Sequence, residues 1–139
     1  MKRMWEINVN LQYIESYANF KNTVIRVHDC FVDLFGIDVM NRLPLYIDNA
    51  TAGSGYTPVI TPVLSSYLII KLGVENFSDS AWIMFELAHE MCHYVYYCLY
   101  GIDSQSTPYE ESICTALSLC FLHEFDLGFE RNCSNVRNH

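Results

Sequence analysis

The sequence predicts an α+β fold in which a small sheet, drawn mostly from the N-terminal half, packs on a long N-terminal helix and two later helices. Short stretches rich in β-branched and aromatic residues predict strands, and longer stretches with apolar residues every three or four positions predict helices. A chain of 139 residues is the size of one domain, so residues 1–139 are expected to fold as one unit. The expected strands are residues 5–9, 43–47 and 66–72, and the expected helices are residues 11–35, 78–100 and 108–124.

The first half of the chain alternates between these two patterns. Apolar and polar residues alternate over residues 5–9, as in a half-buried strand. The helical pattern of residues 11–35 ends at Gly36, a residue suited to a helix C-terminus. Because proline lacks an amide hydrogen, Pro44 limits the strand of residues 43–47 to a sheet edge or to a strand start.

Two further stretches complete the expected sheet region. Residues 56–63 contain Pro58 and Pro62 and are expected to be extended but irregular. Residues 66–72 have the strongest β-branched and aromatic character in the chain, so they are the clearest strand candidate. An extended substrate can add to an exposed strand edge through backbone hydrogen bonds, and this role for residues 66–72 is a hypothesis.

The motif that organises the chain is His-Glu-x-x-His at residues 89–93, inside the helix predicted for residues 78–100. Two histidines four positions apart lie on the same helix face, so His89 and His93 can bind one metal ion. Glu90 lies about 100° further round the helix, where it can act as a general base on a water at the metal. Zinc suits this set because it binds histidine nitrogen and can keep an open position for water.

A catalytic zinc usually has three protein ligands, so a third is expected after the motif. The segment Thr-Pro-Tyr-Glu that ends at Glu110 has the form of a capping box, in which Thr107 caps the amide of residue 110 and Glu110 bonds back to the amide of residue 107. Glu111 has no such role and shares its helix face with the small polar Thr115, so we favour Glu111 and keep Glu110 as the alternative. The full set of candidates is Asp103, Glu110, Glu111, His123, Glu124 and Asp126.

Composition argues against several classes of partner. The formal net charge of −8 disfavours nucleic acid or an anionic membrane as the main partner. No apolar run has the length of a membrane span, and the basic start lacks the apolar core of a secretion signal, so we expect a cytoplasmic protein. The six cysteines form no Cys-x-x-Cys pair and are expected to be buried free thiols. They are Cys30, Cys92, Cys98, Cys114, Cys120 and Cys133.

His-Glu-x-x-His on one helix, followed by a glutamate on the next, resembles the gluzincin branch of zinc metallopeptidases. The likeness is closest to the small single-domain proteins of bacteria and phages in that branch. It rests on residues 85–95 and 109–114, which together cover under a third of the chain. The spacing between His93 and Glu111 is also similar to that of several gluzincin families.

The resemblance implies a minimal zincin-like fold with a small sheet over the metal helix. It implies that His89, His93 and Glu111 bind Zn²⁺, and that Glu90 acts as general base and later protonates the leaving amine. One departure is Thr115, which stands where gluzincins often carry an aspartate four residues after the ligand glutamate.

Two functions are consistent with these features, beside the interpretation that this is a structural protein in which the His-Glu-x-x-His motif arises by chance. The first is zinc-dependent hydrolysis of a peptide bond in a peptide or protein substrate, by a metal-activated water with Glu90 as general base. The alternative is a non-catalytic zinc-binding module with a zincin-like fold and a regulatory or interaction role. The intact Glu90 favours the enzyme, because a site without turnover needs no base.

Overall fold

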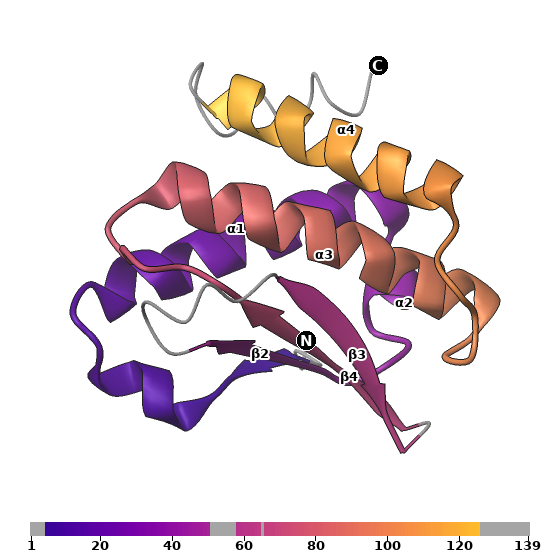
Figure 1. Ribbon diagram of the computed structural model, residues 1–139, viewed down its shortest axis with the longest axis horizontal. Helices are drawn as coiled ribbons and strands as arrows, with labels where there is room; N and C mark the ends of the chain where they lie inside the picture. Colours follow the sequence, from indigo (N-terminus) through magenta and orange to yellow (C-terminus); the bar gives the residue numbers. More distant parts are fainter. Residues whose placement is uncertain (1–4, 51–57, 65, 126–139) are drawn as a thin grey trace.

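The computed structural model describes residues 5–50, 58–64 and 66–125, which form a mixed α+β domain with a four-stranded sheet and four α-helices (Figure 1). Within these residues, none of the helices combines the length and the apolar character needed to span a bilayer. In chain order the elements are β1 (Trp5–Ile7), the 3-10 helix η1 (Val9–Tyr13), α1 (Tyr17–Phe35), α2 (Ile37–Met40), β2 (Leu45–Asn49), β3 (Val59–Val63), β4 (Tyr67–Leu72), α3 (Ser80–Tyr100) and α4 (Pro108–Phe125).

The sheet has the strand order β1-β2-β4-β3. Strands β1, β2 and β4 run parallel, whereas β3 pairs antiparallel with β4 and forms one edge. Because successive side chains of a strand point to opposite faces, alternate residues of β2 and β4 share one face of the sheet. Those alternate residues are buried against the helices, and they are Leu45, Ile47, Leu68, Ile70 and Leu72.

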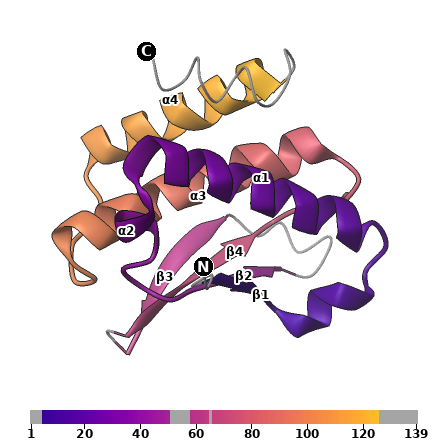
Figure 2. The same ribbon diagram turned by 180° about the vertical axis from the view of Figure 1, so that it is seen from behind.

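The helices lie in two layers on that face of the sheet. Helices α1 and α3 lie side by side against the sheet, and α4 packs on α3 on the side away from the sheet (Figures 1 and 2). Phe31 of α1 contacts Phe121 of α4 with a ring-centroid distance of 5.3 Å, which joins the two layers. Helix α3 is therefore enclosed by the sheet, α1 and α4. This enclosure explains why its sequence is apolar on nearly every side.

Local capping signals set the boundaries of α3 and α4 close to the predicted ones. The side chain of Asp79 accepts a hydrogen bond of 3.1 Å from the amide of Trp82 at the start of α3. Gly101, with a φ of 103°, ends that helix in a conformation that favours glycine. At the start of α4, the Thr107 hydroxyl accepts a 3.1 Å hydrogen bond from the amide of Glu110, as the capping box predicts.

The single helix predicted for residues 11–35 is wrong at its start. Helix η1 precedes α1, and the chain leaves the helical conformation between them. Ile14 is extended and Ser16 has a left-handed φ of 64°. Leu11, Ile14 and Tyr17 recur every three positions across this break. The apolar periodicity therefore continues through the interruption and could not reveal it.

The predicted strands need two corrections. Residues 59–63, expected to be irregular, form the regular strand β3, and Pro62 is tolerated there because β3 is an edge strand. Strand β4 is consequently paired on both sides, so the hypothesis that residues 66–72 offer an exposed edge is wrong. Strand β2 begins at Leu45, directly after Pro44, which agrees with the prediction that this proline marks a strand start.

The cysteines agree only in part with the expectation of buried free thiols. Cys120 is a free thiol but is exposed, and Cys30 is disulfide-bonded, so the expectation is wrong for these two. Cys133 lies outside the described residues. The cysteines that are both free and buried are Cys92, Cys98 and Cys114.

Candidate metal centre

Helix α3 holds the two histidines of the motif on one face. His89 and His93 are one turn apart, with ring centroids separated by 5.1 Å. The neighbouring Leu87, Ala88 and Met91 are fully buried, so the helix cannot rotate to expose the motif. The His93 side chain is only 7% exposed, which means that its ring nitrogens need partners within the protein.

Both histidines point to the carboxylate of Glu111, at the start of α4. The Nε2 atom of His89 lies 2.6 Å from Oε1 of Glu111, and the Nε2 atom of His93 lies 2.9 Å from Oε2. Ligand atoms around a tetrahedral zinc lie about 3.4 Å apart, given metal–ligand bonds near 2.0–2.2 Å. The Glu111 carboxylate, with a side chain that is 54% exposed, would need to withdraw by less than about 1 Å to fit a cation. The three residues therefore fit a metal ion, and their roles as ligands stay a prediction.

The second nitrogen of each histidine also has a partner on α4. Nδ1 of His93 lies 2.5 Å from Oε2 of the buried Glu110. Nδ1 of His89 lies 3.4 Å from the hydroxyl of Thr115. When Nδ1 donates its hydrogen to such a partner, the lone pair of Nε2 is left free to bind a cation. Thr115 thus occupies a position beside His89 that suits a supporting partner of a metal ligand.

The two adjacent glutamates of α4 have different environments. The carboxylate expected to bond back to the amide of residue 107 instead lies against His93, because Glu110 faces into the space between α3 and α4. Glu111 is exposed and faces the Nε2 atoms of both histidines. Among the described residues, Asp103, His123 and Glu124 join no group that could hold a metal, and Asp126 lies outside them.

A second group of potential ligands shares one histidine with the first. His93, Glu110 and Cys114 also lie close enough together to hold a metal, and all three are buried. A hydrogen bond with Cys92, together with burial, raises the pKa of the Cys114 thiol above its usual range. A protonated thiol is a poor metal ligand, because the thiolate is the binding form. The group of His89, His93 and Glu111 is therefore the better candidate.

Glu90 differs from every other carboxylate near the histidines. It is only 6% exposed, and no hydrogen bond joins its carboxylate to another described residue. Burial raises its pKa from 4.5 to about 7, an effect that His93 opposes and that Glu111 and Glu86 reinforce. A cation held by the adjacent ligands would lower this pKa again, because an opposite charge favours the ionised form.

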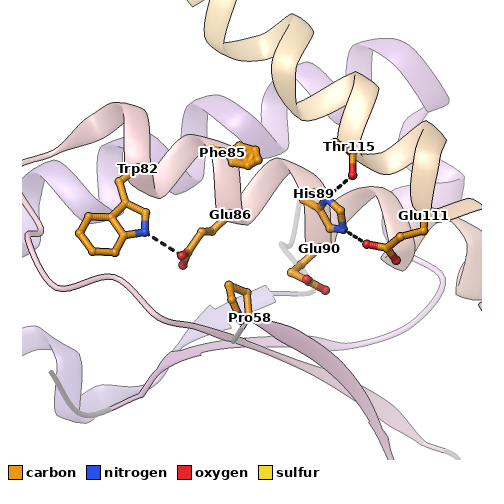
Figure 3. Close-up of a pocket in the computed structure, with 8 residues that line it drawn as sticks. All are labelled: Pro58, Trp82, Phe85, Glu86, His89, Glu90, Glu111 and Thr115. Atoms are coloured by element: carbon orange, nitrogen blue, oxygen red, sulfur yellow. Dashed lines mark hydrogen bonds and ion pairs between the residues drawn. The ribbon is translucent and has the colours of Figure 1, made fainter. Parts of the chain in front are cut away.

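An open cavity of about 500 Å³ connects these groups with the N-terminal half of α3. Figure 3 shows His89 and Glu111 at one end, Trp82 and Glu86 at the other, and Glu90 between them. Pro58, directly before β3, lies below the cavity in this view, and Phe85 and Thr115 complete the lining.

Trp82 and Glu86 were not among the residues predicted for the site. The indole Nε1 of Trp82 donates a 2.7 Å hydrogen bond to Oε2 of Glu86, and the amide of Gly73 donates one of 2.8 Å to Oε1. Their spacing could have predicted this position, because residues three and seven positions before His89 lie on the same helix face as that histidine.

The comparisons with known proteins returned nothing: no family model, no curated protein and no solved structure matches this chain. The arrangement of the site therefore rests on this chain alone.

Proposed function

We propose that this protein is a zinc-dependent peptidase that uses Glu90 as its general base. The observation that carries the proposal is the position of the Glu90 carboxylate: it is buried, has no hydrogen bond to a described residue and opens on the cavity shared with His89 and Glu111. Partial burial of a carboxylate with no partner in the chain is unfavourable, and this one faces a cavity, so its presence here argues for a task that needs a poised acid–base group.

The donor set favours zinc among common metals. Two imidazole nitrogens and one carboxylate form the ligand set of several catalytic zinc sites, which leave a fourth position open. A zinc ion bound there would act as a Lewis acid on a carbonyl and lower the pKa of a bound water.

Within this proposal, each residue of the chain has a defined task. Glu90 takes a proton from the attacking water and returns it to the leaving nitrogen of the peptide. Glu110 and Thr115 hold the rings of His93 and His89 so that the two Nε2 atoms face the same point. The aromatic and proline residues that line the cavity offer apolar surface to the substrate beside the reacting bond.

The edge strand β3 supplies a way to hold a substrate. Its outer edge has no neighbouring strand among the described residues, and Pro58 at its start lines the cavity. An extended peptide that pairs with this edge would pass the cavity next to Glu90. This corrected role replaces the one expected for residues 66–72, which are interior to the sheet.

The test combines zinc content with hydrolysis in wild type and Glu90→Gln. We expect about one zinc per chain in both proteins, and cleavage of a fluorogenic peptide library that falls by about 10²- to 10⁴-fold in Glu90→Gln. Glu75→Gln, which removes one exposed carboxylate outside the cavity, is the matched control and should cleave like wild type.

Two outcomes would overturn the peptidase. Equal hydrolysis by wild type and Glu90→Gln would remove Glu90 from the reaction. Bound zinc without cleavage of any library peptide would favour the alternative, a non-catalytic zinc-binding module with a regulatory or interaction role.

A further inference from the structure

The end of the cavity formed by Trp82 and Glu86 has a composition that the hydrolytic step does not require. The Glu86 carboxylate is held between two neutral donors, the indole of Trp82 and the amide of Gly73. This clamp joins α3 to the end of β4 and fixes the direction of the carboxylate. A surface glutamate with freely rotating bonds would not present its oxygens at one defined place in a cavity.

Glu86 keeps binding capacity after these two hydrogen bonds. A carboxylate oxygen has two lone-pair positions, and each oxygen of Glu86 uses one of them for a bond to the chain. Its two neutral partners leave the negative charge unpaired, and no lysine or arginine is among the described residues that line the cavity. The charge at this end is therefore available to a cation from outside the chain.

An aromatic side chain lies beside Glu86. Figure 3 shows the Glu86 carboxylate beside the edge of the Trp82 indole, and Phe85 also lines the cavity. A guanidinium or ammonium group is attracted to a carboxylate. The indole meets Glu86 with its N–H edge, so Trp82 contributes apolar surface for the stem of such a side chain. An aromatic wall next to a negative charge therefore suits a long side chain with an apolar stem and a cationic tip.

The distance from the proposed base also fits such a side chain. Glu86 precedes Glu90 by one helical turn, so the two side chains begin about 6 Å apart on neighbouring parts of the same face. Lysine and arginine side chains span a similar length. A peptide bond placed beside Glu90 would thus allow the side chain next to it to reach Glu86.

We propose that the Trp82–Glu86 end of the cavity is a subsite for a cationic side chain adjacent to the scissile bond, so that the peptidase selects lysine or arginine there. The placement of this side chain next to a cleaved bond rests on the proposed function. Binding of a cationic side chain to the subsite does not itself require turnover. The formal net charge of −8 would also attract basic segments of a substrate to the protein.

The test measures binding of two amides that differ only in charge. Nα-acetyl-arginine amide and its neutral isostere Nα-acetyl-citrulline amide are titrated into the full chain, with and without zinc, while the indole N–H signal of Trp82 is followed by NMR. We expect the arginine amide to bind about tenfold more tightly than the citrulline amide, because only the guanidinium forms charge-assisted hydrogen bonds with Glu86. The Trp82 signal should move with arginine, since its partner is the same carboxylate.

Glu86→Gln should reduce the arginine-to-citrulline ratio to about one, whereas the matched control Glu75→Gln should leave it at about ten. Equal binding of the two amides to wild type, or an unmoved Trp82 signal, would overturn the subsite. The wild-type comparison decides the matter even if Glu86→Gln does not fold. The binding test of the subsite and the test of the peptidase can fail independently, because only the second uses hydrolysis by wild type and Glu90→Gln.

Discussion

The two ends of the cavity differ in how their carboxylates are satisfied. At one end, both oxygens of Glu86 accept hydrogen bonds from donors of the chain itself. At the other end, the exposed Glu111 meets the two histidine nitrogens that would face a metal. Glu90, which lies between the two ends, is buried without a hydrogen bond to a described residue. At the first end the chain itself supplies hydrogen bonds to both carboxylate oxygens, although the negative charge has no charged partner. At the second end three groups lie close enough together to hold a metal ion. Local rules of stability are commonly broken at the place where function resides.

Replacing Glu111 by glutamine should have the largest effect on the metal end. We expect zinc affinity to fall by more than about 100-fold. Loss of a residue that only hydrogen-bonds to a metal ligand already lowers metal affinity by about 10- to 100-fold, and Glu111 is a proposed ligand itself. The free energy of unfolding of the metal-free chain should change by less than about 1 kcal/mol, since this side chain is half exposed. Competition with a chromophoric chelator and urea denaturation in excess chelator measure the two quantities. Unchanged zinc affinity would mean that another group is the third ligand.

Replacing Glu110 by glutamine is the matched comparison for its neighbour. We expect zinc affinity to fall by about 10- to 100-fold, because the ring of His93 loses a charged partner at Nδ1 but keeps Nε2 for the metal. The same chelator competition measures it. A larger loss in Glu110→Gln than in Glu111→Gln would exchange the roles of the two glutamates.

Replacing Glu86 by glutamine should have a smaller effect, and the effect should be on the stability of the metal-free chain instead of on zinc affinity. The metal-free chain should lose about 1 kcal/mol of unfolding free energy, because one amide oxygen must serve two N–H donors.

Glu90→Gln is the control for the loss of stability expected in Glu86→Gln. Both variants are compared as metal-free protein at pH 8. Burial raises the pKa of Glu90 to about 7, so at pH 8 the folded chain carries an unfavourable buried charge that glutamine removes. Urea denaturation should therefore show equal or higher stability for Glu90→Gln than for wild type. A loss of unfolding free energy equal to that of Glu86→Gln would contradict the contrast drawn between Glu86 and Glu90.

Short segments of the sequence determine much of the helical scaffold that carries the site. The spacing of His89 and His93, the cap at Asp79 and the stop at Gly101 all act within a few residues, so they could be predicted without a partner element. The same holds for Thr107, which starts α4 and so brings two glutamates to one helical turn.

The tertiary structure decided what these segments meet. Only the pairing of β3 with β4 makes residues 59–63 the sheet edge and places β4 in the interior of the sheet. Only the packing of α4 on α3 turns Glu110 toward Nδ1 of His93 instead of toward its own helix start. The bond from Gly73 to Glu86 likewise depends on where β4 ends beside α3. Capping and periodicity act over a few residues of chain and can be predicted from sequence, whereas these contacts join segments distant in sequence and depend on how whole elements pack.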